Sequence, residues 1–84
     1  MQIPSFTIYP NPTSGNFTLE QKSETIFEKV RVEIYSMRGE RVLAGEISGE
    51  RKHEFRLPDL PQGLYFVKVV ADGYAGTFKL VRQK

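Results

Sequence analysis

The chain lacks cysteine, has no tryptophan and has a single histidine. Without cysteine there are no disulfides, no thiol nucleophile and no cysteine-ligated zinc site. The histidine, His53, and the aspartates Asp59 and Asp72 lie far apart in the sequence, and no cluster of oxygen ligands has the spacing of a calcium loop. We therefore expect neither a metal site nor a cofactor.

Long apolar runs and a strong charge of one sign are also missing. No stretch approaches the roughly 18 apolar residues of a membrane helix, and no signal peptide precedes the first predicted strand. The net charge is +2, from 12 basic and 10 acidic residues that are mostly interspersed. Neither nucleic acid nor a membrane is therefore indicated as a partner. The basic cluster at 51–53 is flanked by Glu50 and Glu54 and is interpreted as a solvated turn.

Residues suited to nucleophilic catalysis are sparse. No nucleophile-elbow pattern surrounds Ser14, and nothing in the sequence orients the imidazole of His53. The carboxylates fall mostly on alternating positions that face outward, as solubility requires. We expect no catalytic residue and no enzyme.

Turn-forming residues divide the chain at short intervals, and between them apolar residues alternate with polar ones in the period of a β-strand. The predicted strands are 5–9, 16–20, 29–35, 41–47, 53–57, 64–70 and 74–82. Seven short strands without a helical period favour a single all-β domain. The predicted fold is a seven-stranded antiparallel β-sandwich, immunoglobulin-like and of Greek-key type.

The segment 64–70 follows a turn rich in proline and glycine and carries apolar residues on both faces. This pattern predicts a central strand, with Tyr65, Val67 and Val69 facing the core. Aromatic side chains are assigned to the core by default, whereas those of Phe66 and Tyr74 are not clearly assigned. The aromatic residues on predicted inward positions are Phe6, Phe17, Phe55, Tyr65 and Phe78.

Glycines mark several predicted turns. Gly39 closes the turn 36–40 at a position that needs positive φ, and Gly63 is expected to have positive φ before the strand 64–70. The dipeptide 72–73 is Asp-Gly, a strong hairpin signal. Gly45 lies inside a predicted strand and suggests a bulge or bend.

Four segments resemble the motifs of one family, the C-terminal sorting domains of the type IX secretion system of Bacteroidetes. An Ile-Tyr-Pro-Asn-Pro opening is followed by an alternating strand that ends in a turn glycine, a Gly-x-Tyr core and a short basic-apolar tail. The segments are 8–12 with Gly15 and Phe17, 32–39, 60–69 and 78–84. The motif residues that we assign to turns and core are Tyr9, Pro10, Asn11, Pro12, Gly15, Gly39, Gly63 and Tyr65.

The resemblance implies that the chain is one C-terminal sorting domain, 1–84, of a larger secreted cargo protein. Such domains direct the cargo through the periplasm and across the outer membrane, with the type IX translocon and its shuttle components as partners. A sortase-like cysteine protease then removes the domain and can attach the cargo to an anionic lipopolysaccharide, so the cargo is secreted or held at the cell surface. The family fold is a seven-stranded β-sandwich.

The C-terminal segment is our candidate for the sorting signal. A terminal strand with a free end can be presented to a receptor, for example by pairing along a sheet edge. In this segment the basic side chains would steer the encounter and Leu80 or Val81 would supply an apolar anchor. The residues assigned to translocon recognition are Lys79, Leu80, Val81, Arg82, Gln83 and Lys84.

Two other functions remain open. An immunoglobulin-like accessory module of a secreted enzyme or adhesin would bind carbohydrate or protein through exposed aromatics such as Phe66 or Tyr74. A structural spacer would need no binding surface. The burial of those aromatic side chains and the effect of a C-terminal deletion on export separate the three functions.

Overall fold

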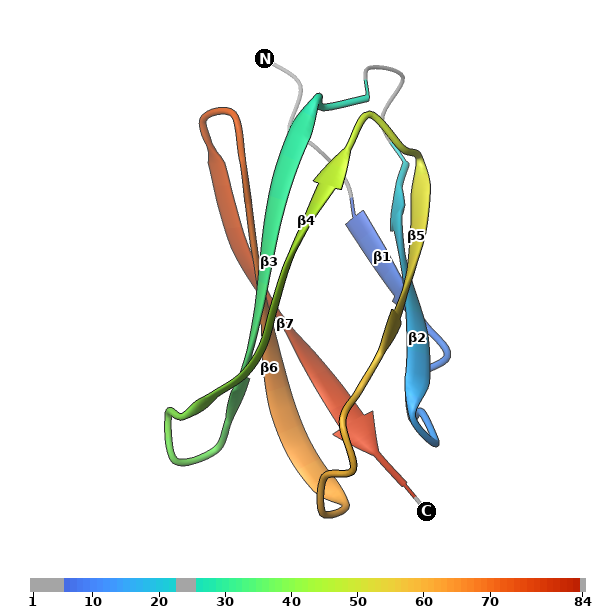
Figure 1. The fold of residues 1–84 in the computed structure, drawn as a ribbon, viewed down its shortest axis with the longest axis vertical. Helices are drawn as coiled ribbons and strands as arrows, with labels where there is room; N and C mark the ends of the chain where they lie inside the picture. Colours follow the sequence, from blue (N-terminus) through green and yellow to red (C-terminus); the bar gives the residue numbers. More distant parts are fainter. Residues whose placement is uncertain (1–5, 23–25, 84) are drawn as a thin grey trace.

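A computed structural model of the chain describes residues 6–22 and 26–83. These residues form seven β-strands and no helix (Figure 1). Each strand begins and ends within one residue of its predicted segment, except that Ser5, the predicted start of the first, lies outside the described residues. The strands are β1 (Phe6–Tyr9), β2 (Asn16–Gln21), β3 (Lys29–Ser36), β4 (Arg41–Ser48), β5 (Lys52–Arg56), β6 (Gly63–Ala71) and β7 (Tyr74–Arg82).

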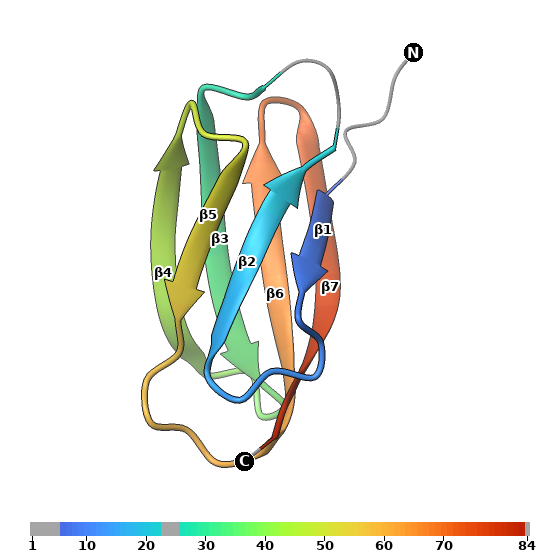
Figure 2. The ribbon, with the colours of Figure 1, turned by 90° about the vertical axis from the view of Figure 1, so that its right-hand side faces the viewer.

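The strands form two sheets that pack face to face (Figure 2). One sheet has the order β1-β2-β5 and the other the order β4-β3-β6-β7, and every pairing within them is antiparallel. Strand β5 crosses to the smaller sheet, so β3 and β6 become neighbours although two strands separate them in sequence. The predicted all-β sandwich is confirmed. Its finer description as immunoglobulin-like and of Greek-key type stays a prediction.

Alternation along β3 shows why these residues form a half-buried strand. The side chains of Val30, Val32 and Ile34 are at most 1% exposed, whereas Arg31 is exposed and Glu33 is half-exposed. β-branched residues fit a pleated surface well, and successive side chains point to opposite faces of the sheet. The strand therefore places its apolar side chains between the sheets and its charges in solvent.

Strand β6 is central, as its sequence predicts. It pairs with β3 on one side and β7 on the other, and its inward residues Tyr65, Val67 and Val69 are buried. Its outward residues Leu64 and Phe66 are only half-buried. The second apolar face is therefore the outer surface of the sheet, and strand neighbours on both sides provide its partial burial.

The predicted turns have the expected glycines. In the turn between β3 and β4, the amide of Ser36 donates to the carbonyl of Glu40 (2.8 Å), and Gly39 has φ of 89°. The hairpin between β6 and β7 has the two-residue loop Asp72-Gly73, with φ of 73° at Gly73. Such φ values are strained for any residue that carries a Cβ.

The bulge suggested at Gly45 is wrong. Gly45 is in regular register opposite Val32, and the irregularity in this strand pair lies between Ile34 and Tyr35. A Cβ atom at position 45 would lie 3.0 Å from the ring of Phe55, which reaches across from β5 in the other sheet. Glycine is present because an aromatic ring packs against the backbone at this point.

The inward aromatic residues lie in the core as predicted. Phe6, Phe17, Phe55 and Tyr65 are at most 8% exposed, and Phe78 is half-buried against the core. The ring of Tyr74, unassigned from the sequence, packs 5.4 Å from that of Phe6.

Candidate functional site

The predicted signal residues alternate in burial along the end of β7. Leu80 is 0% exposed and lies opposite Tyr65 in the core, whereas Lys79 is exposed and Val81 is 37% exposed. Gln83 is exposed and Lys84 lies outside the described residues. Leu80 is therefore inaccessible in the folded domain, and of the two predicted apolar anchors only Val81 faces solvent.

The edge of β7 is not available for strand pairing between Lys79 and Gln83, because the loop after β1 covers it (Figure 2). The carboxamide of Asn11 donates to the carbonyl of Lys79 (2.8 Å) and accepts from the amide of Val81 (2.9 Å). The backbone of Thr13 continues the pairing, donating to the carbonyl of Val81 (2.8 Å) and accepting from the amide of Gln83 (2.7 Å). The edge groups that a receptor strand would need are already bonded within the domain.

Thr13 anchors this loop and was missed by the sequence analysis. It is 1% exposed, and its hydroxyl donates to the carbonyl of Asn16 and accepts from the amide of Gly15 (3.1 Å). Its backbone also forms a parallel bridge with Arg82. A lone threonine in a loop of proline, serine and glycine has no periodic pattern that would reveal such a role.

Arg82 ties the end of β7 to two loops. Its Nε donates to the carbonyl of Leu60 (3.0 Å), and its guanidinium also donates to the carbonyl of Ser14. The guanidinium lies against Gly15, where a Cβ would be 3.4 Å from Nη1. Arg82 therefore holds backbone carbonyls, whereas the ammonium of Lys79 has no bond or ion pair within the part of the chain that the structure describes.

The tyrosines of the family motifs both donate hydrogen bonds, Tyr65 to a loop carbonyl and Tyr9 to a neighbouring strand. The hydroxyl of Tyr65, 6% exposed, donates to the carbonyl of Pro61 (2.6 Å) and closes the loop before β6. The hydroxyl of Tyr9 donates to Glu20 (2.9 Å). This bond raises the pKa of Tyr9 and, as its largest cause, lowers the pKa of Glu20. Gly63 has φ of 150°, as expected.

The proline loop belongs to the same end of the molecule. The peptide bonds that precede Pro10 and Pro12 are both cis. Both prolines are exposed, and between them stands Asn11, whose side chain reaches β7. The opening motif and the C-terminal segment, far apart in sequence, are thus in direct contact.

The structure does not bring Ser14 and His53 together. His53 lies opposite Leu19 in the pairing of β2 with β5, whereas Ser14 lies in the loop before β2, where its carbonyl accepts from Arg82. Its Nδ1 lies 3.0 Å from a carboxylate oxygen of Glu50, and its ring packs 4.7 Å from that of Phe55. His53 is therefore interpreted as a partly exposed residue near the end of a strand.

Within residues 6–22 and 26–83, no group of three or more His, Asp or Glu residues has the geometry to hold a metal ion. None of the elements in that part of the chain is a helix able to span a membrane.

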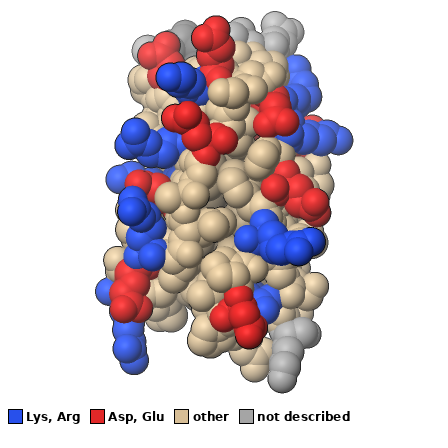
Figure 3. All heavy atoms as spheres, in the orientation of Figure 1, with Lys and Arg blue, Asp and Glu red and all other residues tan. Residues whose placement is uncertain are grey.

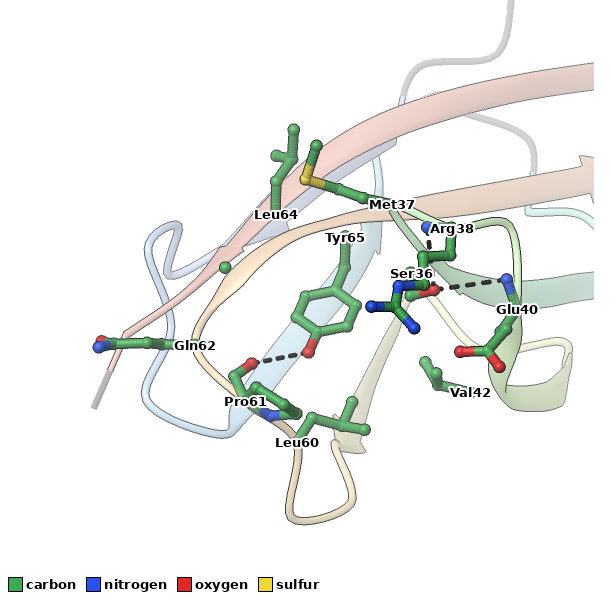
Figure 4. Close-up of a pocket in the computed structure, with 11 residues that line it drawn as sticks. Ser36, Met37, Arg38, Glu40, Val42, Leu60, Pro61, Gln62, Leu64 and Tyr65 are labelled. Atoms are coloured by element: carbon green, nitrogen blue, oxygen red, sulfur yellow. Dashed lines mark hydrogen bonds between the residues drawn. The ribbon is translucent and has the colours of Figure 1, made fainter.

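A pocket of about 500 Å³ opens at the start of β6 (Figure 4). It lies between the turn that joins β3 to β4 and the loop that leads into β6. Its apolar lining includes Val42, Leu60 and Tyr65, with Met37 and Leu64 at its rim. Arg38 and Glu40 supply its charged groups.

Comparison with known proteins agrees with the motif arrangement. Residues 7–83 match the family described as secretion system C-terminal sorting domain. Karilysin of Tannerella forsythia is 30% identical over 89 aligned positions, which cover 96% of this chain. The chain spans 19% of the length of karilysin. Since the family match includes nearly the whole sandwich, the chain belongs to the family of secretion system C-terminal sorting domains and is a sorting domain of the type IX secretion system.

Proposed function

We propose that this domain is carried at the C-terminus of a larger secreted protein and directs that cargo across the outer membrane. The family match over residues 7–83 supports the proposal. Sorting domains of this family are not catalytic, and we extend this to the present chain. The domain functions by folding stably and presenting a surface that a receptor binds.

The proposal implies two partners. These are the outer-membrane translocon of the type IX system and its shuttle components, which the domain contacts in the periplasm. After export, a sortase-like cysteine protease cuts before the domain and the cargo is released or remains at the cell surface. The N-terminal share of the full-length protein supplies the cargo activity. Mass spectrometry of the exported cargo tests the cleavage, because its C-terminus must then precede Phe6.

Within the domain, we assign recognition to the segment from Lys79 to Lys84. Lys79 and Val81 present accessible side chains at the end of β7. Arg82 supports this presentation by fixing the strand end to the carbonyls of Leu60 and Ser14. The loop residues Asn11 and Thr13 hold the segment in one conformation.

The test is C-terminal truncation of the full-length protein in its own cell. We expect removal of residues 79–84 to abolish export and truncation after Arg82 to reduce it. The shorter truncation keeps Leu80 in the core, so its melting temperature should stay close to that of the parent. Normal export after removal of 79–84 would contradict the proposal. Loss of export only in variants that have unfolded would assign the effect to stability instead.

The rival function, a glycan- or protein-binding accessory module, has weaker support. Tyr74 packs against Phe6, and Phe66 is half-buried between strand neighbours. Binding of the full-length protein to a glycan array, lost on Phe66→Ala and with export unchanged, would favour that function.

A further inference from the structure

The folded domain limits which parts of its C-terminal segment a receptor can contact. This inference rests on the proposed function. A strand offers a receptor its two side-chain faces and its backbone edge. On the inner face Leu80 is 0% exposed, and at the edge Asn11 and Thr13 occupy the backbone groups from Lys79 to Gln83. Only the outer face remains accessible.

Strand register determines which side chains lie next to Lys79 and Val81 on the outer face. Lys79 lies opposite Phe66, and Val81 opposite Leu64, in the pairing of β6 with β7. Phe66 lies opposite Tyr35 in the pairing with β3. Side chains directly opposite on one face of an antiparallel pair are in contact range. The segment is therefore presented as part of a wider apolar surface.

The adjoining turn extends this surface. Met37 is 71% exposed, and exposed apolar side chains indicate a contact surface where several of them lie together. Met37 and Leu64 both line the pocket to which Val42 and Leu60 also contribute (Figure 4). We name the set Leu64, Phe66, Lys79, Val81 and Met37 the signal face.

Charge around the signal face favours an acidic partner. Lys79 and Arg38 have no ion pair within the described residues, whereas Glu33 is bonded to Tyr35 (3.0 Å) and Arg41 (3.3 Å). The nearby carboxylate of Glu40 has no ion pair with any residue in 6–22 or 26–83. Lys and Arg side chains follow the left margin of Figure 3, where the outer face of the larger sheet is seen in profile, with Asp and Glu side chains among them. Two copies of so basic a face would repel each other.

We propose that the signal face docks a protein segment of the secretion machinery that carries a bulky apolar side chain next to a carboxylate. The apolar side chain enters the pocket past Met37 and Leu64, and the carboxylate pairs with Lys79 or Arg38. The signal is thus a composite of β6, β7 and the β3–β4 turn. The terminal peptide alone is insufficient.

The test uses the full-length protein in its own cell. Leu64→Thr combined with Phe66→Thr keeps strand-compatible side chains while removing the apolar surface, and we expect at least tenfold lower export. Val70→Thr is the matched control: it lies half-buried on the outer face of the same strand, at the other end, opposite Arg31 and Ala75. Its export should be unchanged. Melting temperatures of all variants verify folding.

A charge series tests the acidic partner. Lys79→Glu should lower export at least tenfold and Lys79→Arg should retain it, while Lys29→Glu, at the far end of the same face, should have little effect. Normal export of a folded Leu64→Thr, Phe66→Thr variant overturns the proposal. So does sedimentation showing a dimer that Phe66→Thr dissociates, because the face would then bind a second copy.

The two proposals fail in different ways. If removal of 79–84 leaves export normal, the proposed function itself is wrong. If that removal blocks export but the folded variants of Leu64 and Phe66 are exported normally, only the composite signal face is wrong.

Discussion

The side chain of Asn11 substitutes for a strand at the edge of β7, bonding both the carbonyl of Lys79 (2.8 Å) and the amide of Val81 (2.9 Å). One carboxamide thereby supplies a donor and an acceptor at strand spacing. Sheet edges with unpaired groups are sites of unwanted association. The proline loop therefore both orders the C-terminal segment and protects its edge.

Asn11→Ala should destabilise the domain by about 1–2 kcal/mol, since two exposed hydrogen bonds are lost at roughly 0.5–1.5 kcal/mol each. The hydrogen-exchange rate of the Val81 amide should also increase in this variant. Asn16→Ala is the control, because that exposed side chain makes no hydrogen bond with the described residues. Equal exchange at Val81 in both variants would contradict the role of Asn11.

Gly63→Val should cost about 1–3 kcal/mol, because φ of 150° is strained for a residue with a Cβ. No atom lies within 4 Å of the position that a Cβ would take. The loss of stability therefore arises from backbone strain and not from a steric clash, and Gly63→Ala should destabilise the domain nearly as much. Urea denaturation measures both, and a stable Ala variant would show that the backbone relaxes.

Val67→Ala should cost roughly 2–4 kcal/mol, because the side chain is 0% exposed at the centre of the sandwich and its truncation leaves a cavity. Val70→Ala, half-buried on the outer face of the same strand, should cost clearly less. Thermal unfolding compares the two, and equal losses would be inconsistent with the assigned faces.

Gly45→Val should destabilise by about 1–3 kcal/mol through overpacking, because Phe55 lies 3.0 Å from the Cβ position. The ring of Phe55 has little freedom to move, since those of Phe17 and His53 flank it at 5.4 and 4.7 Å. Phe55→Leu should reduce the penalty of Gly45→Val in a double-mutant cycle. Additive effects would rule out the contact as the cause.

Acid should weaken the fold through Glu20 and Glu33. Hydrogen bonds from Tyr9 and Tyr35 are the largest causes that lower the pKa of each carboxylate below its ordinary value of 4.5. Their contribution is present above pH 4.5 and is lost as the pH falls through the folded-state pKa values. The double variant Tyr9→Phe, Tyr35→Phe should show a weaker dependence of the urea midpoint on pH as the pH falls below 4.5. Parallel curves for parent and variant would refute this origin.

The same hydrogen bonds also make stability depend on pH in alkaline solution, where stability falls as the pH rises. They raise the pKa of Tyr9 and of Tyr35 above the ordinary 10.0, with the bond to the glutamate as the largest cause in each case. The contribution holds below pH 10.0 and is lost as the pH rises through the higher folded values. The double Phe variant should therefore be less sensitive to alkali as well.

Most of the fold follows from local patterns in the sequence. The alternation of Val30, Val32 and Ile34, and the turn glycines at 39 and 73, place strands and hairpins to within a residue. Gly45 shows the limit. A glycine within a strand is equally consistent with a bulge and with a close neighbour, and that neighbour, Phe55, comes from the other sheet.

For the candidate site, the sequence determined which segments matter: the Pro-Asn-Pro opening, the Gly-x-Tyr core and the C-terminal tail. Only the tertiary structure decided how they relate. Asn11 and Val81 are 70 residues apart, and Leu64 meets Val81 only because β6 and β7 pair in one register. Periodicity reports which way a side chain faces within its own strand, but contacts between distant loops and edges depend on how the sheets pack. The covered edge, the buried Leu80 beside an exposed Val81, and the composite signal face are properties of the folded domain.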